Sequence, residues 1–198
     1  MKKGGTVIDM KYEKLFKDHT QELRETIDRL DQYYEQVIEV AKQFKKAFDS
    51  GNKILIAGNG GSGAQALHLS DEMVGRYRND RQAYPAISLT ADGAVITCIG
   101  NDFGYDNVFG RQVAAFGQPG DIFVGLTTSG ASENILKAAA VARERGMLII
   151  GFMGEGGVFQ ELCDFVLQAP SKKSAVVQEM HLHAIHLLCE LFEEPISI

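Results

Sequence analysis

Short apolar runs alternate with longer amphipathic stretches along most of the chain. Segments between the runs carry apolar residues at helical spacing, which predicts helices, and each run is short enough for a buried strand. Strands that alternate with helices favour a parallel sheet covered on both faces. We therefore predict a single-domain, doubly wound α/β fold of about five strands, at residues 54–57, 84–89, 121–126, 147–152 and 165–167.

The stretch before the first strand has a different character. Residues 11–50 contain no Gly or Pro and carry apolar residues at helical spacing, which predicts one or two amphipathic helices closed by Gly51. Residues 1–10 are expected to be loose. The helical arm either covers its own sheet or lies on a neighbouring subunit, and both interpretations stay open. We divide the chain into an N-terminal helical extension, 1–52, and an α/β domain, 53–198, that form one structural unit.

A glycine-rich loop follows the first predicted strand, and Ser62 is the predicted N-cap of the next helix. Strand, glycine-rich turn and helix start form an arrangement that directs backbone N–H groups at an anion. Gly58, Gly60 and Gly63 also fit the G-x-G-x-x-G pattern of dinucleotide sites. That alternative needs an acidic residue at the end of the second strand, whereas Asp92 comes only in the following turn.

A second polar loop, 127–132, follows the third strand and precedes a helix. It holds four hydroxyl side chains in six residues, although one hydroxyl suffices to cap a helix. Hydroxyls beside free N–H groups of a helix N-terminus can hold phosphate oxygens. Both loops lie at the carboxyl ends of strands, where open α/β sheets bind ligands. We therefore predict a phosphate site there.

Candidate proton-transfer or metal-binding side chains lie on two helices. His68 and Glu72 are four residues apart, so they share a helix face. The last predicted helix carries Gln178 and three histidines, and Gln178 and His186 can point to a common side. The spacing does not decide which histidine functions.

Four motifs now occur in order between about residues 53 and 194: GNGGSxxxAxHxxxE, GND, TTSGxSxN and QExHxxxIH. Together they resemble phosphoheptose isomerases, which have the sugar-isomerase (SIS) fold. The resemblance implies conversion of sedoheptulose 7-phosphate to D-glycero-D-manno-heptose 7-phosphate for bacterial surface glycans. It also implies a homotetramer with active sites between subunits and one zinc ion per subunit.

The resemblance assigns roles residue by residue. Glu72 and His186 would be the proton-transfer pair. Zinc ligands would be His68, Glu72, Gln178 and His186. Substrate contacts would come from Asn59, Gly60, Gly61, Ser62, Glu72, Asn101, Asp102, Thr127, Thr128, Ser129, Ser132 and Gln178, with the last four hydroxyl residues on the phosphate. Gly63 and Ala175 stand where relatives carry His or Asp, which affects outer contacts.

The chemistry of the residues agrees with this resemblance. Aldose–ketose isomerisation proceeds through an enediol(ate) and needs a base near carbon, an acid near oxygen and stabilisation of negative charge. A non-catalytic SIS-fold tetramer that associates with a replication initiator is the alternative. We disfavour it because Glu72 and His186, which the chemistry needs, are both present.

Composition excludes other classes. The net charge of −6 and the lack of a basic stripe argue against nucleic acid. No apolar run approaches a membrane span, and no signal peptide is evident, so we expect a soluble cytoplasmic protein without a membrane partner. Cys98, Cys163 and Cys189 are far apart, and we expect reduced core thiols.

Overall fold

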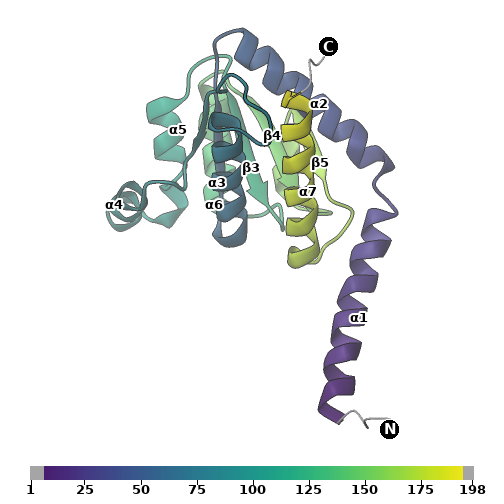
Figure 1. Cartoon of the computed structure of the whole chain (residues 1–198). Coiled ribbons are helices and arrows are strands. Elements are labelled where there is room, and N and C mark those ends of the chain that lie inside the picture. Colours follow the sequence, from purple (N-terminus) through teal and green to yellow (C-terminus); the bar gives the residue numbers. More distant parts are fainter. Residues whose placement is uncertain (1–6, 194–198) are drawn as a thin grey trace.

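The computed structural model describes residues 7–193, and its centre is a five-stranded sheet (Figure 1). All neighbouring strands are parallel, in the order β2-β1-β3-β4-β5. The doubly wound α/β prediction is therefore confirmed. The strands are β1 (Ile54–Gly58), β2 (Ala86–Ser88), β3 (Ile122–Thr127), β4 (Leu148–Met153) and β5 (Phe165–Gln168).

Helices cover both faces of this sheet. Ile54 and Ile56 of β1 pack in a core with α2 (Asp31–Asp49), α3 (Gly60–Val74) and α7 (Ser174–Glu193). Leu55 and Ala57 alternate to the opposite face, as successive strand residues must. That face is covered by α4 (Gly93–Phe103), α5 (Gly110–Phe116) and α6 (Glu133–Glu144), with 3-10 turns at Tyr105–Asn107 and Val158–Leu162.

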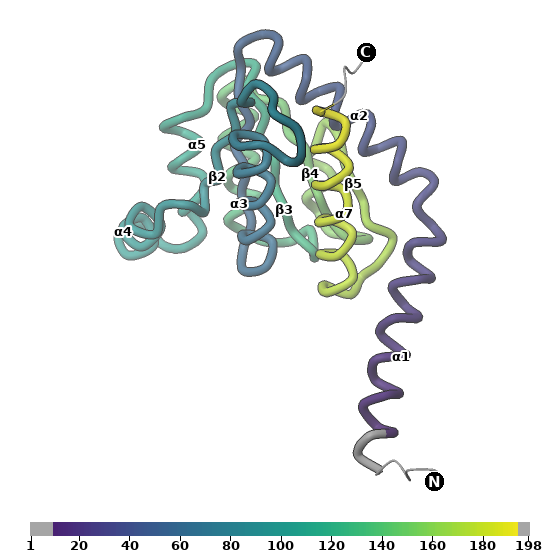
Figure 2. Tube along the Cα trace, viewed as in Figure 1, coloured from purple at the N-terminus to yellow at the C-terminus, as the bar shows by residue number. Residues whose placement is uncertain are grey.

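The N-terminal arm is divided between two helices. α2 buries Tyr33, Val37 and Phe44 against its own sheet, so the first interpretation of the arm holds for this helix. α1 (Val7–Ile27) instead projects from the α/β body (Figure 1; Figure 2). Several of its apolar side chains are exposed, with Leu15 at 60% and Phe16 at 65%, whereas Leu23 packs on the core. Helix α1 therefore presents an exposed apolar surface.

Several local predictions were wrong. Helix α1 already begins at Val7, so the expected loose segment is helical over residues 7–10, and the rest of that prediction lies outside the described residues. Asn59, not Ser62, is the N-cap of α3, because the helix begins directly after Asn59 at Gly60. Ser62 lies in the first turn and is buried.

The GND motif lies in a helix, although two glycines and two polar residues in residues 100–104 would predict a polar turn. The Asp92 side chain accepts hydrogen bonds from the N–H groups of Ala94 and Val95, which caps the start of α4. The helix then runs to Phe103 and ends at Gly104, whose φ of +84° suits glycine. Cys98 is consequently exposed on α4 rather than buried in a core. Within residues 7–193, no helix has the length and apolar character needed to cross a membrane.

Candidate active site

The two polar loops meet where the winding of the sheet reverses. Neighbouring strands β1 and β3 end side by side, with Gly58 in register with Leu126. The chain leaves β1 into α3 on one face and leaves β3 into α6 on the other. This reversal is the position where doubly wound sheets bind ligands.

An amide pair joins the loops at this reversal. The Asn59 amide nitrogen donates to Asn134 Oδ1, and the Asn134 amide nitrogen donates to Asn59 Oδ1, each at 2.8 Å. Tyr105 also donates its hydroxyl to Asn59 Oδ1 at 3.0 Å. Asn134 is only 3% exposed, so these bonds satisfy a buried amide. The sequence analysis gave Asn134 and Tyr105 no role, although Asn134 closes the TTSGxSxN motif.

The hydroxyls of the 127–132 loop are not used to cap α6. Ser132 is the N-cap residue by position, yet its side chain makes no capping hydrogen bond. Its Oγ lies 3.1 Å from Thr127 Oγ1 instead. The simple cap interpretation is therefore wrong for Ser132, and the N-terminal N–H groups of α6 are left for other acceptors.

The backbone conformation of the 127–132 loop brings its hydroxyl side chains close together. Gly130 has a φ of +64°, and its N–H donates to Thr127 Oγ1 at 3.2 Å. A Cβ on Gly157 would clash with the Ser129 carbonyl oxygen, so the 154–157 turn can lie this close to the 127–132 loop only with glycine at position 157. Thr128 Oγ1 lies 3.0 Å from Ser174 Oγ at the start of α7. The loop thus lies beside the N-termini of both α6 and α7.

Gln178 of α7 lies against the first turn of α3. A Cβ on Gly61 would lie 2.6 Å from the Gln178 amide nitrogen, so a larger residue there would displace the Gln178 side chain from this position. Gln65 donates its amide nitrogen to the Gln178 carbonyl at 2.5 Å. Gln178 is therefore close to the glycine loop, and its role as a substrate contact stays a prediction.

Further along the same two helices, imidazoles and a carboxylate converge. His68 Nε2 lies 3.2 Å from His186 Nε2 and 3.7 Å from Glu72 Oε1. His68 Nδ1 lies 3.8 Å from Asp71 Oδ1, but the Asp71 side chain is 73% exposed. The prediction that His68, Glu72 and His186 share one site agrees with these distances.

The structure distinguishes the histidines of α7. Only His186 reaches His68, because His181 is fully buried against Phe152 and His183 packs edge-on to Tyr34. Burial, and then the nearby His68, lower the pKa of His186. A lowered pKa favours the neutral imidazole, which can accept a proton or bind a metal.

The donor set at His68 fits zinc. Two nitrogen ligands about 2.05 Å from a tetrahedral zinc ion are roughly 3.3 Å apart. The two Nε2 atoms are 3.2 Å apart, and Glu72 Oε1 lies 3.7 Å from His68 Nε2. Within the described residues, the donor atoms that all lie within 4.8 Å of one another are those of His68, Asp71 and Glu72. Gln178 is not with them, because its amide lies at Gly61, seven residues or about 10 Å of helix rise before His68.

The GND residues lie apart from both clusters. Asn101 donates its amide to Asp102 Oδ1 at 2.7 Å, and both side chains are exposed on the last turns of α4. Helix α4 lies on the far side of α3 from α7 (Figure 1). No hydrogen bond within the described chain joins either residue to the polar loops.

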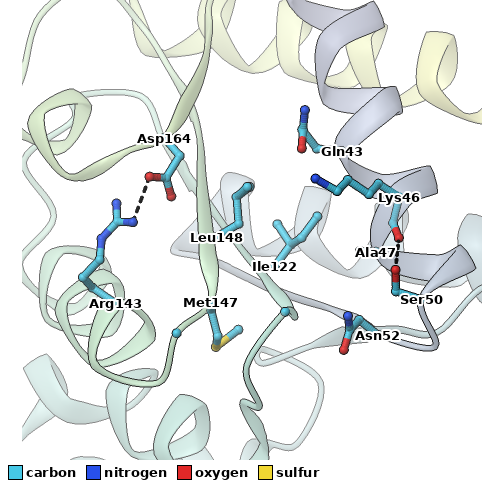
Figure 3. Close-up of a pocket in the computed structure, with 12 residues that line it drawn as sticks. Gln43, Lys46, Ala47, Ser50, Asn52, Ile122, Arg143, Met147, Leu148 and Asp164 are labelled. Atoms are coloured by element: carbon cyan, nitrogen blue, oxygen red, sulfur yellow. Dashed lines mark hydrogen bonds and ion pairs between the residues drawn. The ribbon is translucent and has the colours of Figure 1, made fainter. Parts of the chain in front are cut away.

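A separate cavity of about 420 Å³ opens at the opposite edge of the sheet (Figure 3). Ile122 and Leu148, the first residues of β3 and β4, form part of its wall, and Arg143 and Asp164 pair beside them at 2.8 Å. None of the predicted site residues lines it. The carboxyl edge therefore remains the candidate site.

Comparison with known proteins gives the same picture. A family model described as SIS domain matches residues 18–154. The chain is 47% identical to the phosphoheptose isomerase of Pelobacter propionicus over 79% of this chain and 83% of the relative. It is also 47% identical to that of Synechocystis sp., over 87% and 90% respectively.

A solved structure agrees with the fold as a whole. The phosphoheptose isomerase of Neisseria gonorrhoeae superposes with a TM-score of 0.83 and 34% sequence identity, over 94% of this chain and 99% of the relative.

Proposed function

The chain belongs to the SIS-domain family and, within it, to the phosphoheptose isomerases; from this membership we infer that it is an aldose–ketose isomerase of sugar phosphates. It converts sedoheptulose 7-phosphate to D-glycero-D-manno-heptose 7-phosphate in heptose biosynthesis. The convergence of His68, Glu72 and His186 is the observation that carries this conclusion. The same convergence is why the non-catalytic binding protein is not favoured.

We assign the phosphate to the 127–132 loop. Its hydroxyls and the N-terminus of α6 supply hydrogen-bond donors and a favourable helix dipole, both of which suit an anion. Asn59, Gly60, Gly61, Ser62 and Gln178 would contact the sugar from the neighbouring loop and helix. Asn101 and Asp102 are proposed to contact the sugar as well, from α4.

Glu72 and His186 would transfer the protons. The Glu72 carboxylate removes the proton from C1 of the ketose, and the resulting enediolate takes that proton back at C2. His186 gives a proton to the C2 oxygen and accepts one from the C1 hydroxyl, so the aldose forms with no net proton change. Glu72 is mostly buried, with its side chain 18% exposed, which limits competition from water.

Zinc would be held by His68, Glu72 and His186, with Gln178 as the fourth ligand. The distances from His68 to His186 and to Glu72 support this set, whereas Gln178 must turn away from Gly61 to join them. When bound, zinc polarises a carbonyl and stabilises negative charge on oxygen.

The assembly is proposed to be a homotetramer with active sites between subunits. Helix α1 exposes apolar residues that a second copy would cover. The glycine loop, which the Asn59–Asn134 amide pair joins to the phosphate loop, is also separated from the His68 cluster within one chain: from Gly60 to His68, α3 rises about 12 Å. Sites between subunits would combine the loop of one chain with the cluster of another.

Two coarser assignments complete the proposal. The 1–52 extension and the 53–198 domain are proposed as one structural unit, because α2 contributes to the core of the sheet. A cytoplasmic location is proposed because sugar-phosphate metabolism supplies the substrate there.

Turnover by the purified protein tests the function. We expect sedoheptulose 7-phosphate to be consumed, and a chelator to slow the reaction. Glu72→Gln should lower turnover by about 10²–10⁴-fold, whereas Glu144→Gln, on the exposed side of α6, should not. Near-normal turnover in Glu72→Gln would contradict the proposed base and favour the non-catalytic binding protein instead.

A further inference from the structure

The segment 75–84, between α3 and β2, folds back over the end of α7. Glu193 of α7 accepts hydrogen bonds from the backbone N–H groups of Arg78 and Asn79, the latter at 2.8 Å. The Arg78 guanidinium pairs with Glu190 at 2.5 Å. Two carboxylates of α7 therefore fix the middle of the segment at the helix end.

This attachment places Tyr77 on a proposed catalytic histidine. The Tyr77 ring stacks on His186, with ring centroids 5.6 Å apart and planes 28° from parallel. His68 meets the same imidazole edge-on, with centroids 5.3 Å apart. The Arg78 guanidinium carbon lies 4.9 Å from the Tyr77 ring centroid. His186 is thus held between an aromatic ring and a second imidazole.

The far end of the segment reaches the other proposed catalytic residue. Arg81 donates to the carbonyl oxygens of Glu72, at 2.5 Å, and Met73, at 3.0 Å, which are among the last carbonyls of α3. Such carbonyls have no partner within the helix, and a cation there is favourable. The Arg81 guanidinium also lies over the Tyr84 ring. The segment therefore contacts both helices that carry the catalytic pair.

We propose that Tyr77 is a positioning residue, which sets the plane of the His186 imidazole so that Nε2 faces His68. The proposal rests on the proposed function, because it gives His186 its role. The stacked ring excludes rotation of the imidazole about its χ2 angle, and an aromatic side chain is sufficient for this. Among residues 7–193, the Tyr77 hydroxyl makes a single hydrogen bond, which it accepts from Arg78 at 3.5 Å, so we assign the positioning role to the ring.

Kinetics of matched variants test the positioning role. Tyr77→Leu should lower kcat by about 10–100-fold, the cost of losing an outer-shell support, while KM changes little. Tyr77→Phe should retain kcat within about twofold, because the ring is kept. Phe116→Leu, an exposed aromatic on α5, controls for loss of an aromatic side chain. Equal kcat values in Tyr77→Leu and Phe116→Leu, with active wild type, would overturn the proposal.

An activity-independent measurement separates this inference from the proposed function. In chelator-treated protein labelled with ¹³C-histidine, His186 ring signals are assigned by their absence in His186→Gln. Tyr77→Leu should shift these signals, because the ring current of the stacked ring is lost, and Tyr77→Phe should not. Unshifted signals in Tyr77→Leu would refute the stacking even in a protein that proves to have no isomerase activity. Inactive wild type with shifted signals would instead refute only the function.

Discussion

If active sites are shared between subunits as proposed, mixed assemblies of two variants should recover a defined share of the activity. One variant disables the phosphate loop: Ser132→Asp keeps a good N-cap residue for α6 but puts a carboxylate where phosphate binds. The second, Glu72→Gln, disables the base and leaves the loop intact. Each variant alone should have little activity, for different reasons.

The expected recovery follows from the separation of the two clusters. If a site takes its loop from one chain and its base from another, a mixed assembly contains sites with both intact parts. Random association of equal amounts yields about a quarter of such sites, hence about a quarter of wild-type turnover. If each site lies within one chain, every site in the mixture keeps one defect, and turnover stays at the level of the separate variants.

The assay uses two affinity tags on co-expressed variants, so that only mixed assemblies are purified. Turnover of sedoheptulose 7-phosphate is then compared with that of equally tagged mixtures of each variant with itself. A mixed assembly no more active than these controls would refute the shared sites. The approximately 12 Å between Gly60 and His68 would then have to be spanned by substrate within one chain.

Three further predictions concern other parts of the chain. Asn134→Ala removes both bonds to Asn59 and leaves the half-buried Asn59 amide without its partner, so urea unfolding should show a loss of about 0.5–1.5 kcal/mol and kcat/KM should fall; unchanged values would contradict the bridge. Burial lowers the pKa of His181 to about 4, and the nearby Met153 carbonyl partly opposes this shift. As the pH falls below about 6.5, the His181 imidazole is therefore protonated in the unfolded chain at a higher pH than in the folded chain, which destabilises the fold. Stability relative to His181→Leu should therefore decrease by roughly 2–3 kcal/mol between pH 7 and 4.5, measured by urea unfolding, with His183→Gln as control; parallel pH curves would contradict it. Deletion of residues 1–27 should leave a folded α/β body but reduce the assembly size in light scattering, because the apolar surface of α1 is lost; an unchanged mass would contradict its role in assembly.

The sheet could be predicted from sequence because its determinants are local. Each strand is an apolar run bounded by turn residues, and each helix has its own apolar face. The start of α4 is likewise local, because Asp92 caps two of its first free N–H groups. Its end is not: the helix continues through Asn101 and Asp102 to Phe103, although Gly100 and Gly104 around them favour a turn.

In the candidate site, too, some residues could be predicted from local spacing and others could not. His68 and Glu72 could be paired from their spacing on one helix, since four residues place both on one face. The choice among three histidines of α7 could not, because it depends on which side of α7 faces α3 and which faces β4. Phe152 buries His181, whereas Tyr77 and His68 enclose His186. The role of Asn134 could not be predicted from sequence, because its hydrogen-bond partner, Asn59, is 75 residues away.

A doubly wound sheet explains why the two halves of the site arise separately. The carboxyl edge offers helix N-termini, which suit a phosphate, but it has few places for a cluster of imidazoles. Side chains four residues apart on α3, facing α7, supply that cluster further from the edge. Local geometry thus forms the phosphate loop and the His68 cluster separately. One active site can combine them only if the substrate is long enough to reach both or if a second chain supplies one of them. Segment 75–84 fits this division, because it connects the ends of α3 and α7 and so holds Glu72 and His186 as one unit whichever chain supplies the phosphate loop.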